Sequence, residues 1–403
     1  MLIVQKFGGT SVGDLDRIQN VASRVSETKK AGNDVVVVVS AMSGETNKLV
    51  QYAEHFSSSP SRAEMDMLLS SGERVTASLL SIALNEMGHV ACAMTGRKAG
   101  IVTDTVHTKA RIENINPEVM KSAIKEGKII VVAGFQGVNE NGDVTTLGRG
   151  GSDLSAVAIA GALKADLCEI YTDVSGIYTT DPRIEPKAKK LDNISYDEML
   201  ELASLGAKVL QNRSVELAKK LNVNLVTRTS FSNEEGTLIT TEGNIMEKPL
   251  VSGIALDKNQ ARISLMGVKD RPGIASDIFT KLSNSDVNID MIIQNKAHDG
   301  TTNIDFTVLV GDINDAKAVV DTFVDSGDIS ADSYNDKICK VSVVGVGMKS
   351  HSGVAARAFS TMADENININ MISTSEIKIS MVIDEKYAEL AVRSLHNAYE
   401  LDK

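Results

Sequence analysis

The sequence predicts an α/β domain with a mainly parallel sheet, followed by two smaller units of the βαββαβ type. Three observations lead to this prediction. Apolar strand-like runs alternate with segments of helical period over about the first 240 residues. Runs such as DVVVVVS at 34–40 are apolar on both faces of a strand. A repeat with a different pattern begins near residue 263, and a chain of 403 residues is long enough for two or three domains.

The first domain, which we place at residues 1–245, is defined by its strands. The clearest apolar runs are Leu2–Phe7, Val35–Ser40, Ile129–Ala133 and Leu167–Tyr171. Strands that are apolar on both faces are typical of a parallel sheet that is covered by helices on each side. We therefore expect helices on both faces of this sheet.

The second half of the chain contains an internal repeat. Residues 263–294, ISLMGVKDRPGIASDIFTKLSNSDVNIDMIIQ, are echoed by residues 341–373, VSVVGVGMKSHSGVAARAFSTMADENININMIS. Each copy has the pattern strand, loop, helix, strand. The first copy continues with a strand at Asn303–Leu309, a helix at Asp315–Asp325 and a last strand near Ile329. These elements complete a ferredoxin-like βαββαβ unit, which we place at residues 263–335.

The second copy reaches the end of the chain before its fold is complete. After a strand at Ile377–Ile383 and a helix at Lys386–Tyr399, only Glu400–Lys403 remain, which is too short for a fourth strand. Leu250–Leu256 forms an extra strand before the first copy. We predict that this strand completes the second unit, which then consists of residues 246–262 plus 336–403 and interlocks with the first.

Composition excludes several classes of protein. The net charge of −11 disfavours nucleic-acid partners, and no apolar stretch is long enough to span a membrane. The N-terminus has no signal-peptide pattern, so we expect a cytoplasmic protein. Cys92, Cys168 and Cys339 are widely spaced and lack ligand patterns, so we expect buried small residues and neither a disulfide nor a zinc site.

Two motifs carry groups that suit phosphate and amino-acid binding. Lys6, Gly8, Gly9, Thr10 and Ser11 follow the first strand, where we expect a helix to begin, and glycines there let backbone amides approach a phosphate. The alternative is a tight turn with a solvated lysine. No P-loop or protein-kinase motif is present.

The TLGRGGSD motif is the second. Arg149 stands among glycines and offers a forked donor to a carboxylate, while Ser152 and Asp153 follow at the start of a helix. We interpret this pattern as an amino-acid clamp. In YTDVSGIYTTDPR at 171–183, a polar, turn-rich tail follows a strand at the carboxyl edge of the sheet, where open α/β folds bind nucleotides.

Together, five motifs resemble the amino-acid kinase superfamily and, within it, the aspartokinases. They are KFGGTSVG at 6–13, VVSAMSGETN at 38–47, SGERVTASLL at 71–80, TLGRGGSDLSA at 146–156 and YTDVSGIYTTDPR at 171–183. The repeated units look like ACT domains. The resemblance implies a three-layer amino-acid kinase domain, Mg²⁺ and ATP as cofactors, and transfer of the ATP γ-phosphate to the β-carboxylate of L-aspartate. It also implies feedback by lysine, threonine or both.

The resemblance also assigns roles to individual residues. Lys6 and Asp153 are the implied catalytic residues, and Asp153 would lie near the substrate ammonium. The implied aspartate pocket consists of Arg149, which would hold the α-carboxylate, with Ser40, Thr46, Glu73 and Ser152. Thr46 and Ser152 are equally typical of helix caps. Glu73 could instead be a surface helix charge paired with a neighbour.

The implied ATP ligands are Lys6, Gly8, Gly9, Ser11, Thr172, Asp173, Tyr178, Asp181, Arg183 and Lys208. Asp181-Pro182 is also a common turn, and Tyr178 could pack in the core. Mg²⁺ follows from the ATP chemistry alone, because no side-chain cluster reads as a metal cage.

The implied effector residues are Asp270, Gly273, Ile274, Ala275, Gln294, Asn368, Ile369 and Asn370. The same polar residues also fit strands with exposed alternate positions. Met348–Val354 lacks the Asp-x-Pro-Gly pattern of the first loop, which argues against a second equivalent site. We further expect a homodimer, since exposed sheet edges pair readily. Two other hypotheses remain, a kinase for another small acidic substrate and an amino-acid sensor with a vestigial kinase domain.

Overall fold

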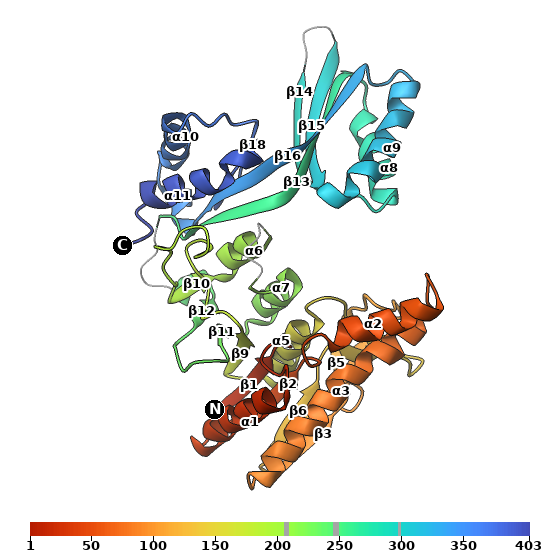
Figure 1. The fold of residues 1–403 in the computed structure, drawn as a ribbon, viewed down its shortest axis with the longest axis vertical. Helices are drawn as coiled ribbons and strands as arrows, with labels where there is room; N and C mark the ends of the chain where they lie inside the picture. The colour runs from red at the N-terminus through yellow and green to blue at the C-terminus, as the bar shows by residue number, and fades with distance from the viewer. Residues whose placement is uncertain (205–208, 245–249, 297–299) are drawn as a thin grey trace. The chain divides into compact units, whose positions relative to one another are not determined.

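The computed structural model describes residues 1–204, 209–244, 250–296 and 300–403 (Figure 1). The chain divides into two compact units. Among the described residues, unit 1 comprises 1–177, 190–204 and 209–244, and unit 2 comprises 178–189, 250–296 and 300–403. Within the described ranges, no helix is both long enough and apolar enough to cross a membrane.

Unit 1 is built on an eight-stranded sheet with the order β10-β12-β11-β9-β1-β2-β6-β3. Its strands are β1 (Leu2–Phe7), β2 (Asp34–Val39), β3 (Ala91–Met94), β6 (Ile129–Ala133), β9 (Leu167–Thr172), β10 (Asn193–Ser195), β11 (Leu225–Thr229) and β12 (Thr237–Thr240). All neighbouring pairs are parallel except β11 and β12. The predicted α/β domain with a mainly parallel sheet is therefore confirmed.

Helices cover both faces of this sheet, as its apolar strands require. On one face, Val35, Val37 and Val39 of β2 share a core with α1 (Leu15–Lys30) and α3 (Arg62–Glu86). Because alternate strand residues point to opposite faces, Val36 and Val38 face the other side. There, α5 (Gly151–Leu163) packs against β1, β2 and β9, and α7 (Asn212–Leu221) packs against α5. Shorter helices are α2 (Glu45–Phe56), α4 (Glu118–Lys125) and α6 (Tyr196–Ser204).

A second, four-stranded sheet of unit 1 has the order β5-β4-β7-β8. It consists of β4 (Ile101–Thr103), β5 (Ile112–Ile115), β7 (Gln136–Val138) and β8 (Val144–Thr146). These strands are too short to show a clear period, which explains why the sequence did not reveal them. The last of them, β8, leads directly into the glycine-rich loop before α5.

Unit 2 contains one continuous six-stranded antiparallel sheet, with the order β14-β15-β13-β16-β18-β17. Its strands are β13 (Gly253–Lys269), β14 (Ile289–Lys296), β15 (Thr301–Leu309), β16 (Ala331–Val344), β17 (Met371–Thr374) and β18 (Lys378–Asp384). Residues 253–257 of β13 pair with 340–344 of β16, and residues 260–266 pair with 331–338. One long strand pair therefore runs through both repeats.

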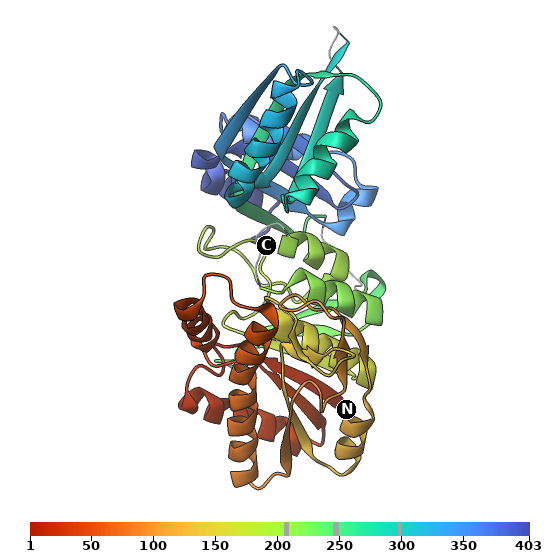
Figure 2. The same cartoon turned by 90° about the vertical axis from the view of Figure 1, so that its right-hand side faces the viewer.

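Four helices cover this sheet, and each repeat has its own core. The helices α8 (Ile274–Asn284) and α9 (Ile313–Asp325) lie side by side, as Figure 2 shows in teal and blue. They share a core with Ile263 of β13. The helices α10 (Val354–Asp364) and α11 (Ala388–Ala398) share the other core with Ile254 and Val341.

One segment of the first predicted domain is grouped with unit 2 in the structure, while the predicted domain boundaries themselves stay predictions. Tyr178–Lys189 belongs to unit 2, although it lies inside the range 1–245 that we predicted as one domain. The reason is local, because the Ile254 amide of β13 donates to the Thr179 carbonyl at 2.7 Å. The other predicted boundaries, at 262/263 and 335/336, stay a prediction.

Candidate functional site

The main cleft of unit 1 has a volume of about 1100 Å³ and lies where β1 and β2 end and α5 begins. Most of the residues that the sequence assigned to aspartate and to catalysis line it. These are Lys6, Ser40, Thr46, Glu73, Arg149, Ser152 and Asp153, together with Gly9. Motifs that are far apart in the chain therefore meet in one cavity.

An ion pair lies beside the cleft. Lys6 Nζ is 2.5 Å from Asp153 Oδ1, and the two residues are only 8% and 9% exposed. Lys6 comes from β1, in the centre of the sheet, and Asp153 comes from the first turn of α5. Each charge offsets the cost of burying the other, and the lysine has further N–H groups available for a ligand.

The glycines on both sides of Arg149 explain how its side chain reaches the cleft. Gly148 and Gly150 have φ angles of 78° and 70°, in the left-handed region that glycine tolerates best. A Cβ atom on Gly150 would come within 2.5 Å of Gln211 Cγ, so the loop also requires a glycine for space. Arg149 itself is exposed and forms no ion pair with the described residues. Its guanidinium is therefore available for a carboxylate.

The helix-cap alternative for Thr46 and Ser152 does not hold. The N-caps of α2 and α5 are Gly44 and Gly150, both in the left-handed conformation. Thr46 and Ser152 each occupy the second position of their helix and line the cleft. Their hydroxyl groups are available to a ligand there.

Glu73 is a buried residue of α3, only 4% exposed, so the surface-charge alternative is wrong. The helix approaches the loop after β2 so closely that a Cβ on Gly72 would lie 2.7 Å from Ala41 Cβ. As a result, the Ala41 amide donates to Glu73 Oε1 at 3.0 Å. Burial raises the pKa of Glu73 from 4.5 to about 7, although this amide opposes the shift. Glu73 Oε2 is buried without a hydrogen-bond partner among the described residues.

The glycine-rich segment differs from the expected turn into a helix. The helix α1 begins only at Leu15, because Asp14 is its N-cap and accepts from the Arg17 amide at 2.8 Å. The Gly8 amide donates to the Tyr171 carbonyl at 3.3 Å, so it is not free for phosphate in this structure. Ser11 Oγ donates to Ser230 Oγ at 2.8 Å. The expectation that a helix begins directly at this segment is therefore wrong, because α1 begins only at Leu15.

The remaining predicted ATP residues fall into separate parts of the chain. Thr172 is the last residue of β9 and Asp173 directly follows it in unit 1, whereas Tyr178, Asp181 and Arg183 belong to unit 2. Arg183 Nη2 lies 2.7 Å from Asp181 Oδ2, and this guanidinium lowers the pKa of Asp181. Tyr178 is half-buried. Lys208 lies outside the residues that the structure describes.

Comparison with known proteins identifies the family. Residues 1–227 match the model described as "Amino acid kinase family", and residues 262–325 and 341–399 each match an ACT domain model. An aspartokinase of Helicobacter pylori strain J99 is 59% identical over 407 aligned residues, which cover 100% of both chains. The chain belongs to the aspartokinase family.

Two solved structures are similar over the whole length. One is E. coli aspartokinase III in complex with aspartate and ADP, in its R-state, with a TM-score of 0.82, 26% identity and coverage of 99% of both chains. The other is the same E. coli protein in complex with lysine and aspartate, in its T-state, with a TM-score of 0.80 and 27% identity. That likeness covers 98% of this chain and 99% of the other. The fold expected from the resemblance is thereby confirmed.

In this family member, the predicted effector residues lie on unit 2. Gly273 is the N-cap of α8 with a φ of 94°, followed by Ile274 and Ala275 in the helix. Asp270 Oδ2 lies 3.3 Å from Lys296 Nζ. Gln294 lies on β14, at one edge of the sheet, and Asn368, Ile369 and Asn370 directly precede β17 at the other edge. Gly353, the N-cap of α10, has a φ of 97°, so both repeats share this turn.

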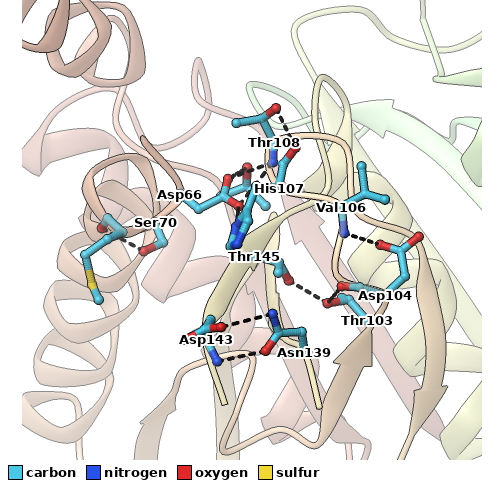
Figure 3. A network of polar contacts seen from close by, with 12 residues as sticks. Asp66, Ser70, Thr103, Asp104, Val106, His107, Thr108, Asn139, Asp143 and Thr145 are labelled. Atoms are coloured by element: carbon cyan, nitrogen blue, oxygen red, sulfur yellow. Dashed lines mark hydrogen bonds and ion pairs between the residues drawn. The ribbon is translucent and has the colours of Figure 1, made fainter. Parts of the chain in front are cut away.

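Sequence reasoning missed a buried carboxylate beside the cleft (Figure 3). Asp66 of α3 is fully buried and accepts from the Thr108 amide at 3.1 Å, from His107 Nδ1 at 2.7 Å, and from the Thr146 hydroxyl. Thr108 has a φ of 67°, which is strained for a β-branched residue, and Asp66 satisfies its amide. The spacing of seven residues from Glu73, which places both acids on one face of α3, was the available signal.

Asp66 connects two loops that contribute cations to the cleft. One loop follows Thr108 and carries Lys109 and Arg111, and the other follows Thr146 and carries Arg149. Arg213 connects the same loops from another side. Its guanidinium donates to the Leu147 carbonyl at 2.9 Å and to the Ala110 carbonyl at 3.1 Å. The walls of the cleft are therefore fixed by two charged residues that the sequence motifs did not single out.

Metal-ligating side chains do not gather in the described part of the chain, where no three His, Cys, Asp or Glu residues are placed to hold an ion. The cysteines are free thiols. Cys168 and Cys339 are buried and Cys92 is half-buried.

Proposed function

We propose that the chain transfers the γ-phosphate of ATP to the β-carboxylate of L-aspartate, giving 4-phospho-L-aspartate. The observation that carries this proposal is the charge pattern of the main cleft. Among the described residues, the Arg149 guanidinium has no ion-pair partner and Glu73 Oε2 has no hydrogen-bond partner, and these two groups match the carboxylate and the ammonium of an amino acid. The similar E. coli aspartokinase III has been solved with aspartate and ADP. We further propose that the reaction is a cytoplasmic first step toward lysine, threonine and methionine.

In this proposal, Arg149 holds the α-carboxylate of aspartate through its planar fork of donors. Glu73 and Asp153 receive the ammonium, which lowers the cost of keeping Glu73 ionised in its buried position. The hydroxyl groups of Ser40, Thr46 and Ser152 complete the pocket. These contacts would leave the β-carboxylate free to point toward the phosphoryl group.

The reaction needs no general base on the enzyme, because the aspartate side chain is already ionised at neutral pH, with an ordinary pKa of about 3.9. Charge neutralisation and positioning therefore carry the catalysis. Lys6 is suited to neutralise the transferring phosphoryl group, since its ammonium is buried next to the cleft. Asp153 holds that ammonium in place at 2.5 Å.

The nucleotide assignment continues the sequence prediction. We propose Lys6, Gly8, Gly9, Ser11, Thr172, Asp173, Tyr178, Asp181, Arg183 and Lys208 as ATP ligands. Gly8 would use its amide only after giving up its bond to Tyr171. We propose a Mg²⁺ ion held largely by phosphate oxygens and water, because no cluster of ligating side chains lies in the described part of the chain. Bound there, the ion would offset phosphate charge.

For regulation, we propose that lysine, threonine or both bind at the loop that begins with Asp270, with Gly273 as the N-cap whose following amides face the ligand. Ile274, Ala275, Gln294, Asn368, Ile369 and Asn370 complete the proposed effector set. The similar E. coli T-state structure contains lysine. Edge strands β14 and β17 expose Ile292 and Ile372 at 52% and 42%, which supports a homodimer formed along these edges.

A coupled assay for ADP release, with Mg²⁺ and either L-aspartate or L-glutamate, tests the reaction. Wild type should turn over with aspartate, and Arg149→Ala should lose most of that activity through a higher KM for aspartate. Arg97→Ala, which removes an exposed arginine outside the cleft, is the matched control. Turnover that is independent of aspartate, or stronger with glutamate, would contradict the assignment of aspartate as the substrate.

The regulatory and dimer proposals need separate measurements. Lysine and threonine, added to the assay singly and together, identify the effector. Light scattering, which measures the molar mass in solution, compares wild type with Ile292→Asp and tests the dimer.

A further inference from the structure

Residues 178–189, which carry three of the proposed ATP ligands, form hydrogen bonds and packing contacts within unit 2. The Thr179 carbonyl accepts from the Ile254 amide at 2.7 Å, which ties the segment to β13. The Thr179 amide donates to the Lys189 carbonyl at 2.9 Å, which closes the segment into a loop. Ile184 packs against the core formed by α10 and α11. We call residues 178–189 the nucleotide loop, a name that rests on the proposed function.

A buried histidine of α11 forms the polar contact at the base of this loop. His396 Nε2 lies 2.9 Å from Thr179 Oγ1, and the two residues are 1% and 4% exposed. Thr179 Oγ1 already accepts from the Lys189 amide at 3.0 Å. Its own hydrogen is therefore free to point at His396 Nε2, which suits an imidazole that is neutral and accepts at this nitrogen.

The two ends of this contact belong to different functional parts of unit 2. On one side, Thr179 follows Tyr178 and precedes Asp181 by two residues, so its position sets where these side chains start. On the other side, α11 contributes Val392 and Leu395 to the core of the second repeat. A shift of α11 in that core would therefore move the hydrogen-bond partner of Thr179.

We propose that His396 is a positioning residue for nucleotide binding, which holds the loop with Asp181 and Arg183 through its hydrogen bond to Thr179. Through this contact, the C-terminal helix of an ACT-type repeat sets the KM for ATP. The inference deepens the proposed function and depends on the loop's role as an ATP site. It assigns a role to a residue that touches neither substrate.

Two substitutions at Thr179 provide the sharpest test. Thr179→Val removes the hydroxyl with little change of shape, and Thr179→Ser keeps it. Thr179→Val loses two hydrogen bonds of Oγ1, the one to His396 and the one from the Lys189 amide, and the loss of about 1 kcal/mol for each corresponds to about a fivefold change in an equilibrium constant. We expect Thr179→Val to raise the KM for ATP by about that factor, with kcat and the KM for aspartate unchanged. Thr179→Ser should behave as wild type.

Two further variants separate positioning from stability. His396→Gln should raise the KM for ATP as Thr179→Val does, and it replaces the valine variant if that fails to fold. Asn397→Ala, on the same helix and lining the same small cavity of about 240 Å³, should leave the KM for ATP unchanged. A lower Tm in both Thr179→Val and His396→Gln with an unchanged KM for ATP would overturn the inference, because the contact would then serve stability alone.

A final variant distinguishes this inference from the nucleotide assignment. Arg183→Ala removes an exposed guanidinium of the loop that is 90% accessible in its side chain. If Arg183→Ala raises the KM for ATP and Thr179→Val does not, the positioning role of His396 is wrong while the proposed function stands. If neither variant changes the KM for ATP, the loop is not an ATP site, and both the assignment and the inference fail.

Discussion

Lys6 Nζ and Asp153 Oδ1 lie 2.5 Å apart, so the central strand and the first turn of α5 are joined through opposite charges beside the cleft. Removing one partner leaves a buried, unpaired charge, which costs about 3–5 kcal/mol in comparable pairs. Lys6→Met should therefore lower both the Tm and kcat, the latter by about 10²–10³-fold if the ammonium stabilises the transferring phosphoryl group.

The double variant Lys6→Met/Asp153→Asn separates the two effects. It removes both charges, so the Tm should recover toward wild type while kcat stays low. Thermal unfolding and steady-state kinetics of the single and double variants provide the measurement. Recovery of kcat together with the Tm would show that Lys6 acts only in stability.

Glu73 should make aspartate binding depend on pH. Its pKa is raised to about 7 by burial, and a bound ammonium favours the ionised form. Binding below this pKa must release a proton, so the KM for aspartate should rise by about tenfold per pH unit below 7 and level off above it. Glu73→Gln should raise the KM and abolish this dependence. A KM profile that Glu73→Gln leaves unchanged would contradict the role.

Glu73 should also make the stability of the ligand-free protein depend on pH, and here a higher pH is unfavourable. Because the folded-state pKa is raised from 4.5 to about 7, the contribution of Glu73 is fully present below 4.5 and is lost as the pH rises through 7. In the ligand-free protein, Glu73→Gln should therefore gain Tm relative to wild type as the pH is raised from 5 to about 8. Differential scanning calorimetry of both proteins across this range measures the effect.

Asp66 should act on the substrate without touching it. Asp66→Asn replaces one acceptor oxygen by a donor that would face the Thr108 amide, the Thr146 hydroxyl or His107. We expect a loss of about 1–3 kcal/mol of stability, together with a higher KM for aspartate. Glu64→Gln, at an exposed position in the first turn of the same helix, is the control. Lost stability with an unchanged KM for aspartate would limit Asp66 to a structural role.

His396 should make the stability of the protein fall in mild acid. Burial lowers its pKa below the ordinary 6.5, opposed by Glu185 and Asp402 and assisted by Lys187. Arg393 also faces the adjoining cavity. A histidine with a lowered pKa stabilises the fold fully above 6.5, and this contribution is lost as the pH falls from 6.5 to the folded-state pKa. The Tm of wild type should therefore fall more steeply than that of His396→Gln between pH 7 and about 5.

The sequence alone predicted the site residues that stand next to glycines or at the end of a strand. Arg149 stands between glycines, and Lys6 lies near the end of an apolar strand, so their placement in one cleft could be anticipated. Gly8 shows the limit of such reasoning. Whether its amide is free depends on the Tyr171 carbonyl of a neighbouring strand, which no local pattern reveals.

Long-range partners explain the other differences. Asp66 reads as an ordinary helix acid, and only the fold shows that it is buried against Thr108 and Thr146. Tyr178–Lys189 lies within the kinase-like half of the sequence but belongs to unit 2 through Thr179. Strand β13 was predicted as two separate strands, because residues 257–262 interrupt its apolar pattern with polar side chains.

That single strand also limits how the two repeats can be separated. Its first part pairs with the end of β16 and its second part with the beginning of β16. Cutting the chain at 262 or at 335 would thus remove an inner strand from one repeat. The other repeat would be left with an edge strand whose backbone N–H and C=O groups are unpaired and prone to aggregation. Neither repeat can therefore be deleted or exchanged by a cut at these positions without also removing a strand from the sheet of the other repeat.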